Sequence, residues 1–367
     1  MTPIALLSSA SRITVKIGSS LLVGKAGVRA AWLASLAADL AALVRDGRQI
    51  VLVSSGAVAL GRGRAALPAS RRLDVKQAAA ALGQPLLMRA WSDALSAQGL
   101  VAAQLLLTFG DTESRSRWRN ARATLEMLLK SGAIPIVNEN DSVATQELRY
   151  GDNDRLSARV AQMTGADLLV LLSDVDGLFA ADPRREPSAP HVPLVDVIDE
   201  ALLATAGRSA GELGTGGMRT KLEAARIAQR SGCTTLIVNG TADHPLSALS
   251  QATIVTAHGS PASAYKAWIA GGLQSAGRLL IDAGAAAALR SGSSLLPSGV
   301  RAVEGDFPHG AAVSIIAPDQ IEVARGLMRY GSVEARAILG RRASDIAALL
   351  GYTRGDELIH RDDLVLR

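Results

Sequence analysis

The sequence predicts an α/β fold of three layers, in which helices cover a mostly parallel open sheet, followed by a small β-rich C-terminal domain. Three observations predict it. Strand-like and helix-like segments alternate from residue 13 to residue 238. The strand-like runs are continuously apolar, as is typical of parallel strands buried on both faces. Beyond residue 277, short apolar runs are separated by glycine, proline and serine, which favours a compact β module.

The predicted elements follow one another in repeated βαβ order. The strands of the first domain are expected at residues 13–17, 49–53, 101–107, 134–137, 168–172 and 234–238. Its helices are expected at residues 31–45, 75–98, 120–130, 155–163 and from 219 to a stop at Gly232. The C-terminal module has strand-like runs at 278–281 and 312–316. In parallel sheets of this kind, ligands bind at the carboxyl ends of the strands.

Length and composition describe an ordinary globular chain of two domains. Its 367 residues are 48% hydrophobic, which is enough to bury a large core. No apolar run approaches the ~18 residues that span a bilayer, and no basic segment precedes the apolar residues 4–7, so we expect a cytoplasmic protein. Cys233 is the only cysteine, which excludes a disulfide framework and a cysteine metal cluster, and we expect it to be a packing residue.

The charge distribution argues against a basic surface that binds nucleic acid. The net charge is +5, but residues 275–367 hold eleven arginines and eleven acidic residues, so the mild excess lies in the longer N-terminal part. Arginine outnumbers lysine by 33 to six. In such a chain, a lysine beside glycines indicates that a compact point charge is needed, and Lys16 and Lys221 are placed in this way.

A glycine-rich stretch, GTGGMRTK, runs from Gly214 to Lys221 and leads into a predicted helix. Helix amides without intrahelical partners, the positive end of the helix dipole and the missing side chains favour a bound anion, and Lys221 would supply a full charge. The phosphate loop of the common nucleotide hydrolases is absent, because Lys221 follows Thr220 rather than glycine. A flexible loop before an ordinary helix is the alternative interpretation.

Polar residues gather where the predicted strands end. The stretches concerned are Gly18-Ser19-Ser20, Ser54-Ser55-Gly56-Ala57, Asn138-Glu139-Asn140-Asp141, Ser173-Asp174-Val175-Asp176-Gly177 and, ahead of a helix, Gly151-Asp152-Asn153-Asp154. Phosphoryl transfer needs positioning and cancellation of negative charge more than covalent work by the protein. In that chemistry Lys16 would contact the transferred group, Lys221 would hold the terminal phosphates, and Asp154 would fix both lysines in place.

Each of these stretches also has a purely structural interpretation. The residues at 152–154 and at 54–55 are of types that cap helices. The aspartates in 174–177 suit a turn before a glycine. The stretch 61–66 matches a dinucleotide fingerprint in its letters only, because it lies within a helix and not directly after a strand. The histidines lack the spacing of metal ligands.

Five stretches occur in a fixed order along the chain, namely VKIGSS (15–20), VSSGA (53–57), IVNEND (136–141), GDND (151–154) and GTGGMRTK (214–221). The ordered set resembles the glutamate 5-kinase branch of the amino-acid kinase family, and the resemblance extends over nearly the whole chain. The stretches 282–286 and 293–300 resemble the PUA domain that many members carry. The resemblance implies a kinase domain with the amino-acid kinase fold at 1–258, a linker at 259–276 and a PUA domain at 277–367.

The resemblance implies ATP-dependent phosphorylation of the side-chain carboxylate of L-glutamate to L-glutamyl 5-phosphate, the first step of proline biosynthesis, with Mg²⁺ carried by the nucleotide. By the family pattern, the catalytic residues are Lys16, Lys221 and Asp154, and the glutamate-binding residues are Ser55, Asp141 and Asn153. The implied ATP-binding residues are Lys16, Gly18, Ser173, Asp174, Thr215, Gly216, Gly217, Met218, Arg219, Thr220 and Lys221. Two of them depart from the pattern: Ser173 stands where threonine is common, and Arg219 where a small residue is common.

Feedback inhibition by proline and a homo-oligomer built on the kinase domain are implied by the family alone. Aspartate, acetylglutamate or a nucleoside monophosphate is the alternative substrate, although Asp141 suits the α-ammonium group that acetylglutamate lacks. RNA binding through the PUA domain is the alternative function, but zero net charge and three aromatic residues (Phe307, Tyr330 and Tyr352) offer little counterion release or base stacking. A structural or regulatory tail is the third alternative, and no membrane partner is expected.

Overall fold

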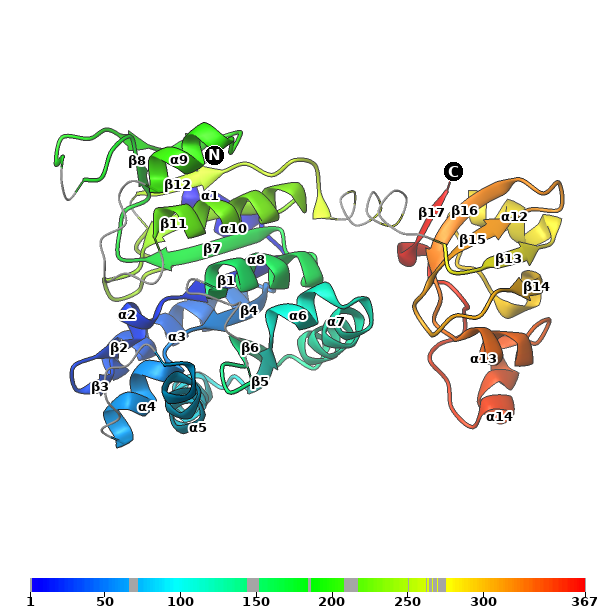
Figure 1. Cartoon of the computed structure of the whole chain (residues 1–367), viewed down its shortest axis with the longest axis horizontal. Coiled ribbons are helices and arrows are strands. Elements are labelled where there is room, and N and C mark those ends of the chain that lie inside the picture. The colour runs from blue at the N-terminus through cyan, green and yellow to red at the C-terminus, as the bar shows by residue number, and fades with distance from the viewer. Residues whose placement is uncertain are drawn as a thin grey trace. The chain divides into compact units, whose positions relative to one another are not determined.

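The computed structural model describes residues 2–65, 72–143, 152–183, 186–207, 217–249, 251–261, 263, 266, 269 and 275–366. The chain divides into two compact units, Met1–Pro261 and Ala262–Arg367 (Figure 1). The first holds a mostly parallel sheet with helices and the second is rich in strands, so the predicted fold class is confirmed. None of the helices in the described ranges has the length and hydropathy to cross a bilayer.

The first unit is built on an eight-stranded sheet with the strand order β10-β12-β11-β7-β1-β4-β6-β5. Its strands are β1 (Arg12–Ile17), β4 (Gln49–Ser54), β5 (Ala102–Leu107), β6 (Ile134–Glu139), β7 (Leu168–Ser173), β10 (Leu194–Val195), β11 (Thr234–Asn239) and β12 (Ala252–Val255). All neighbours are parallel except β11 and β12. The sheet extends from β1 in both directions, toward β4 and toward β7, and such a reversal of strand order is where α/β sheets bind ligands.

Helices cover both faces of this sheet and give three layers (Figure 1). One face packs against α1 (Pro3–Ser9), α3 (Ala30–Arg45) and α5 (Leu73–Ser96), and the other against α7 (Arg115–Lys130), α8 (Asp152–Thr164), α9 (Glu200–Gly207) and α10 (Met218–Arg230). Side chains alternate along each strand, so Val15 lies in the core with α3. Lys16, its neighbour, therefore points to the face that α8 and α10 cover.

Some elements begin earlier than predicted, and others are not among the predicted ones. Helix α7 begins at Arg115 rather than 120, and α8 begins at Asp152 rather than 155. The aspartates of α8 form its first turn instead of preceding it, in a position where the helix dipole favours negative charge. Elements outside the predicted set include α1, β12 and α6 (Phe109–Glu113). Helix α6 is short and depends on a capping box between Thr108 and Asp111.

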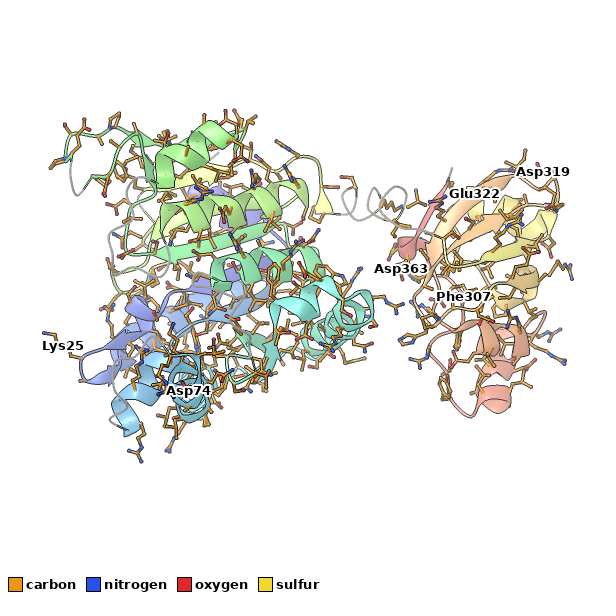
Figure 2. The ribbon with its side chains drawn as sticks, in the orientation of Figure 1. Lys25, Asp74, Phe307, Asp319, Glu322 and Asp363 are labelled. Atoms are coloured by element: carbon orange, nitrogen blue, oxygen red, sulfur yellow. The ribbon has the colours of Figure 1, made fainter. Side chains whose placement is uncertain are left out.

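Several short elements complete the first unit. They are α2 (Ser19–Leu22), a hairpin of β2 (Val23–Gly24) and β3 (Gly27–Val28), α4 (Ala57–Ala65), and a hairpin of β8 (Leu178–Phe179) and β9 (His191–Val192). Lys25 lies at the tip of the first hairpin, and its exposed side chain points into solvent (Figure 2). This lysine also follows a glycine, but it is a surface residue.

Helices α4 and α5 cross at two glycines. A Cβ atom added to Gly83 would lie 1.8 Å from the carbonyl oxygen of Ala57, and one added to Gly61 would lie 1.8 Å from that of Ala79. The two helix backbones are therefore in direct contact, and a side chain at either position would push them apart. Gly61, the first glycine of the stretch 61–66, thus serves helix packing.

The replacement Gly83→Ala is expected to destabilise the chain by about 1–3 kcal/mol, because overpacking at a backbone contact forces the two helices apart. Urea unfolding followed by circular dichroism measures the change. Gly63→Ala is the matched control: it lies in the same pair of helices, and an added Cβ would have no atom within 4 Å. The control is expected to be neutral or more stable by up to ~1 kcal/mol. Equal midpoints for Gly83→Ala and the unchanged protein would contradict the close crossing.

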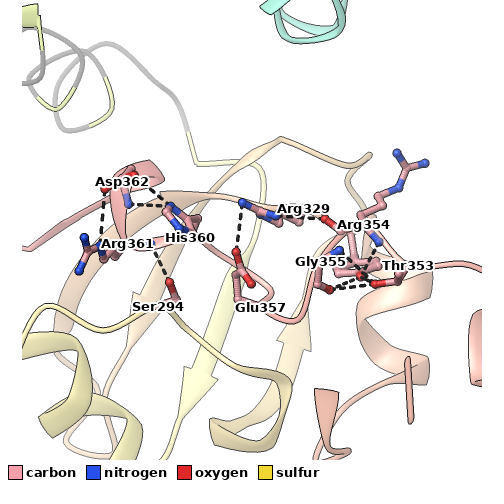
Figure 3. Close-up of polar contacts among 10 residues, drawn as sticks. Ser294, Arg329, Thr353, Arg354, Gly355, Glu357, His360, Arg361 and Asp362 are labelled. Carbon is pink, nitrogen blue, oxygen red and sulfur yellow. Dashed lines mark hydrogen bonds and ion pairs between the residues drawn. The ribbon is translucent and has the colours of Figure 1, made fainter. Parts of the chain in front are cut away.

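The second unit contains a five-stranded sheet with the order β14-β13-β15-β16-β17. Its main elements are β13 (Arg278–Ile281), α12 (Ala283–Arg290), β14 (Val300–Glu304), β15 (Ala312–Ile316), β16 (Glu322–Leu327), α13 (Ser332–Ala337), α14 (Ile346–Leu350) and β17 (Leu364–Leu366). The two predicted strands, 278–281 and 312–316, are confirmed. The guanidinium of Arg329 holds the loop before β17 by pairing with Glu357 at 3.1 Å and donating to the carbonyl of Arg354 (Figure 3).

The aromatic side chains of the second unit mostly belong to its core. Phe307 and Tyr330 are buried, and the hydroxyl of Tyr330 donates to the carbonyl of Gly355 at 2.6 Å. Tyr352 is 40% exposed, with the guanidinium of Arg354 over its ring. Among the described residues from 275 onward, this single exposed ring offers little surface for base stacking.

Candidate active site

Lys16 lies near the carboxyl end of β1, and its side chain enters the space between β1 and α8. Its Nζ atom lies 2.6 Å from Oδ1 of Asp154, and the residue is only 7% exposed. Gly18 borders the amine, since a Cβ added there would lie 3.7 Å from Nζ. With glycine at this position, the backbone beside the amine stays uncovered, as the close approach of an anion requires.

Lys221 reaches the same carboxylate from α10. Gly217 is the N-cap of α10, and Lys221 lies in the turn that follows, with Nζ 3.6 Å from Oδ2 of Asp154. Its neighbour Thr220 donates its hydroxyl to the same oxygen at 2.8 Å. One carboxylate on α8 thus joins the end of β1 to the first turn of α10. The structure brings together the two lysines that the sequence motifs single out.

Asp154 and Lys221 both have shifted pKa values. Burial would raise the pKa of Asp154, but the charges of Lys16 and Lys221 and the hydrogen bonds from Lys16 and Thr220 outweigh it and hold that pKa below its usual value. Burial lowers the pKa of Lys221, and the charge of Lys16 adds to this, although Asp154 and Asp174 act in the opposite sense. Because two amines share one buried carboxylate, an anion bound between them would supply the second negative charge.

A second polar group is centred on Asn153, the residue before Asp154. Its side-chain amide donates to Oγ of Ser55 at 2.6 Å and to Oδ1 of Asn138 at 3.1 Å. The orientation of Asn138 is fixed, because its Oδ1 also accepts from the backbone N–H of Glu139 and its amide donates to Oε1 of Gln84 at 2.8 Å. Both N–H groups of Asn153 are therefore used.

These two hydrogen bonds use the amide nitrogen of Asn153, and its side-chain oxygen takes part in neither of them. This Oδ1 atom is buried and has no hydrogen-bond partner within the described ranges. A buried acceptor without a donor costs about 1–3 kcal/mol, so such atoms in native proteins usually receive a ligand or a water. The oxygen is therefore able to accept from a water or from a ligand with an N–H or ammonium group.

Asn138 and Gln84 belong to this polar group but are not among the predicted site residues. Asn138 stands in one of the strand-end motifs, so its residue type was a usable signal. Gln84 lies far from every motif, on the stripe of α5 that also holds Leu87 and Trp91. A glutamine at this spacing from two core residues is a weak signal, because glutamines are common on helices.

The other predicted site residues on the nucleotide side lie at the ends of β7 and at the start of α10. Ser173 ends β7, and its hydroxyl donates to Oδ1 of the exposed Asp174 at 3.3 Å. The guanidinium of Arg219 is paired with Glu223 of the same helix, with Nε 3.1 Å from Oε1. Arg219 departs from the family pattern, and its additional positive charge is paired with the carboxylate of Glu223.

Of the remaining predicted residues, the structure describes three and does not describe two. Gly217 and Met218 begin α10, and Asp141 is partly buried in the turn that follows β6. Thr215 and Gly216 lie outside the described residues.

The cysteine is separate from the site. Cys233 is buried directly before β11, and burial, assisted by the charge of Asp167, raises the pKa of its thiol. A thiol that stays protonated is a poor nucleophile. It lies in the core with α10, so the prediction that it is a packing residue is confirmed.

Comparison with known families places this geometry in a known group of enzymes. The model of the amino acid kinase family matches residues 11–239, which include Lys16, Asp154 and Lys221. The chain belongs to the amino acid kinase family. A second model, that of the PUA domain, matches residues 277–350 within the β-rich unit.

Curated members of the amino acid kinase family resemble the chain over almost its full length. "Glutamate 5-kinase 1" of Rhizobium meliloti (strain 1021) is 53% identical, covering 98% of this chain and 93% of its own. "Glutamate 5-kinase" of Caulobacter vibrioides (strain NA1000 / CB15N) is 54% identical, covering 98% and 97%. "Glutamate 5-kinase" of Rhizobium etli (strain CIAT 652) is 52% identical, covering 97% and 92%.

Proposed function

We propose that the chain transfers the γ-phosphoryl group of ATP to the side-chain carboxylate of L-glutamate, the glutamate 5-kinase reaction that begins proline biosynthesis. The reaction forms a P–O bond to the carboxylate and breaks the bond between the γ-phosphorus and the bridging oxygen, which leaves with ADP. The observation that carries the proposal is the buried carboxylate of Asp154 between the amines of Lys16 and Lys221. Full-length similarity to proteins named glutamate 5-kinase supports the choice of substrate.

The lysines supply charge where the reaction needs it. In our proposal, Lys16 contacts the phosphoryl group in transit, and Lys221 balances the charge that builds on the bridging oxygen as the bond to it breaks. Asp154 touches neither substrate and acts as a positioning residue for both amines. The remaining proposed nucleotide contacts are Gly18, Ser173, Asp174 and the stretch 215–220.

The polar group around Asn153 suits the amino-acid substrate. Its unpartnered Oδ1 would accept from the α-ammonium group, and Asp141 would add an opposite charge. Ser55 accepts from Asn153 through its oxygen, so its own O–H remains able to donate to a substrate carboxylate. An ammonium site favours glutamate over acetylglutamate.

Magnesium would enter with the nucleotide and neutralise phosphate charge. Among the described residues, no group of three or more His, Cys, Asp or Glu side chains could hold a metal ion. This fits an ion bound mainly by phosphates, because Mg²⁺ usually takes one or two protein carboxylates and keeps several waters. Asp174, exposed at the end of β7 and close enough to Lys221 to act on its pKa, is the carboxylate that would hold it.

Other parts of the proposal do not depend on the geometry of the site. They are feedback inhibition by proline, a homo-oligomer, a cytoplasmic location, and the boundaries 1–258, 259–276 and 277–367 for kinase domain, linker and PUA domain. Nucleic-acid binding by the PUA domain lacks support from its charge, which sums to zero over residues 275–367.

A panel of amino acids tests the substrate. The purified chain is incubated with Mg²⁺, ATP and one of L-glutamate, L-aspartate, N-acetyl-L-glutamate or a nucleoside monophosphate, and ADP release is followed by a coupled assay. L-glutamate should give the highest kcat/KM. A higher value for any other acceptor would overturn the proposed substrate and leave the phosphotransferase assignment standing.

Asn153→Ala is expected to raise the KM for glutamate by about 10- to 100-fold, because a buried hydrogen bond to a charged group contributes about 1.5–3 kcal/mol. The KM for ATP should change far less. Steady-state kinetics with each substrate varied in turn separates the two effects. Asn120→Ala, at an exposed position of α7, is the matched control and should leave both constants unchanged. An unaltered KM for glutamate in Asn153→Ala would remove Asn153 from the substrate site.

A further inference from the structure

A cavity of about 260 Å³ lies between α8 and α10, outside the active site. Its lining residues are Arg155, Glu223, Arg226, Ile227 and Arg230. Four of them stand at positions i, i+3, i+4 and i+7 of α10 and therefore form one stripe along that helix. The fifth, Arg155, approaches from the first turn of α8. The cavity is thus built from two helices that both contribute residues to the catalytic group.

The charges that line this cavity are not balanced. Three guanidinium groups face one carboxylate, that of Glu223, which accepts from both Arg155 and Arg219. Burial raises the pKa of Glu223, but the hydrogen bonds and charges of these two arginines outweigh it and hold the pKa below its usual value. Glu223 therefore stays ionised and is already fully engaged with its two partners.

The other two arginines have little or nothing to bind within the protein. Arg226 pairs with Glu200 at 2.7 Å, but the side chain of Glu200 is 81% exposed, so this contact is readily exchanged. The guanidinium of Arg230 forms no ion pair with any residue that the structure describes. Two forked donors one helical turn apart are consequently available to a ligand in the cavity.

The size and shape of the cavity narrow the class of ligand. Its volume is slightly below the range of about 300–1,000 Å³ usual for drug-sized ligands, so the ligand is small. Guanidinium groups bind phosphate oxygens bidentately, and the three free oxygens of a tetrahedral oxyanion can accept from arginines of both helices. Ile227 adds an apolar wall that would contact the organic part of a phosphate ester.

We propose that this cavity is a second anion site, which binds a small phosphate-bearing molecule between Arg155, Arg226 and Arg230. Bound there, the anion bridges α8 and α10 directly behind the turns that carry Asp154 and Lys221. It should therefore stabilise the folded chain, because a ligand that binds only the folded state adds to its stability. This site uses none of the proposed catalytic or substrate-binding residues and is independent of the identity of the acceptor.

Calorimetric titration of the full chain tests the proposal. Inorganic phosphate and phenyl phosphate are titrated separately, with a non-hydrolysable ATP analogue, Mg²⁺ and glutamate present to occupy the active site. Each should bind at one site, and the affinity should fall as ionic strength rises. The Arg226→Gln/Arg230→Gln variant should bind at least about tenfold more weakly, since each lost charge-assisted hydrogen bond weakens binding. Tighter binding of phenyl phosphate than of inorganic phosphate identifies an organic phosphate as the natural source.

Two further variants keep the result unambiguous. Arg230→Gln alone leaves the contact between Arg226 and Glu200 intact, and it should show most of the loss without altering the melting temperature of the free chain. Arg89→Gln, which removes an exposed arginine of α5, should bind as the unchanged protein does. The proposal is overturned if the unchanged protein shows no saturable binding, or if the double variant retains it. Retained binding in the double variant would place the anion at another part of the chain.

Discussion

Lys221→Met and Lys16→Met are each expected to lower kcat by at least about a hundredfold, which corresponds to roughly 3 kcal/mol of transition-state stabilisation. Methionine keeps the apolar length of the side chain and removes only the amine. Each amine lies within 3.6 Å of Asp154, so in either variant the remaining lysine still has its carboxylate partner. The loss therefore reports the missing charge at the phosphates. Steady-state kinetics with glutamate and ATP measures it.

Two variants control this prediction. Lys221→Arg keeps the charge but replaces a point charge by a wider planar fork. Because Lys221 is only 5% exposed, the variant should recover only part of the activity. Lys130→Met removes an exposed lysine at the end of α7 and should leave kcat unchanged. If Lys16→Met or Lys221→Met kept more than about a tenth of the activity, direct action of that amine on the phosphates would be ruled out.

Asp154→Asn is expected to destabilise the chain by about 3–5 kcal/mol, because it leaves two buried amines without their carboxylate. It should also abolish most activity, since an amide cannot hold both ammonium groups. Urea unfolding of the variant and of the unchanged protein measures the difference in stability. Asp93→Asn is the matched control: its ion pair with Arg89 is exposed, and its loss should cost less than about 1 kcal/mol.

The pH dependence of the free energy of unfolding provides a second test of the contribution of Asp154. Its pKa in the folded chain lies below the usual value, so its contribution is complete above the unfolded pKa of about 3.9 and is lost as pH falls through the folded pKa. The difference in stability between Asp154→Asn and the unchanged protein should therefore be constant near neutrality and shrink at strongly acidic pH. A difference that grew on acidification would mean that the carboxylate is protonated in the native state.

Lys221 affects the pH dependence of the free energy of unfolding at alkaline pH. Its pKa is lowered on folding, so the unfolded chain binds more protons between the folded pKa and the usual value of about 10.4. In that window the contribution of this group to stability rises with pH.

The sheet and the convergence of the lysines could be predicted from sequence because both rest on local patterns. Continuous apolar runs predict buried parallel strands, and the carboxyl ends of such strands meet at one edge. Lys16 is therefore expected at the ligand-binding edge from its position alone. The antiparallel pairing of β12 could not be predicted in this way, because its short β-branched run, Ala252–Val255, favours a strand but does not indicate its neighbour or its direction.

Spacing alone does not predict which residue of Asp152-Asn153-Asp154 contacts the lysines and which contacts Ser55. All three residues are equally good helix caps. In the structure they belong to the first turn of α8, where each residue is rotated by about 100° from the one before it. Asn153 consequently meets Ser55 while Asp154 meets the lysines, and only the position of the helix against the sheet decides which residue does which.

The contact between Asp154 and the two amines has a consequence for the interval between catalytic cycles. Once products have left, the carboxylate is the counter-charge that remains near both amines, and its oxygens already occupy the space between them. The amines of Lys16 and Lys221 therefore do not have to be brought together again when the next nucleotide binds. In the proposed reaction, an aspartate that contacts neither substrate would thus hold both amines in position between cycles, so that little of the incoming binding energy would be needed to rebuild the site.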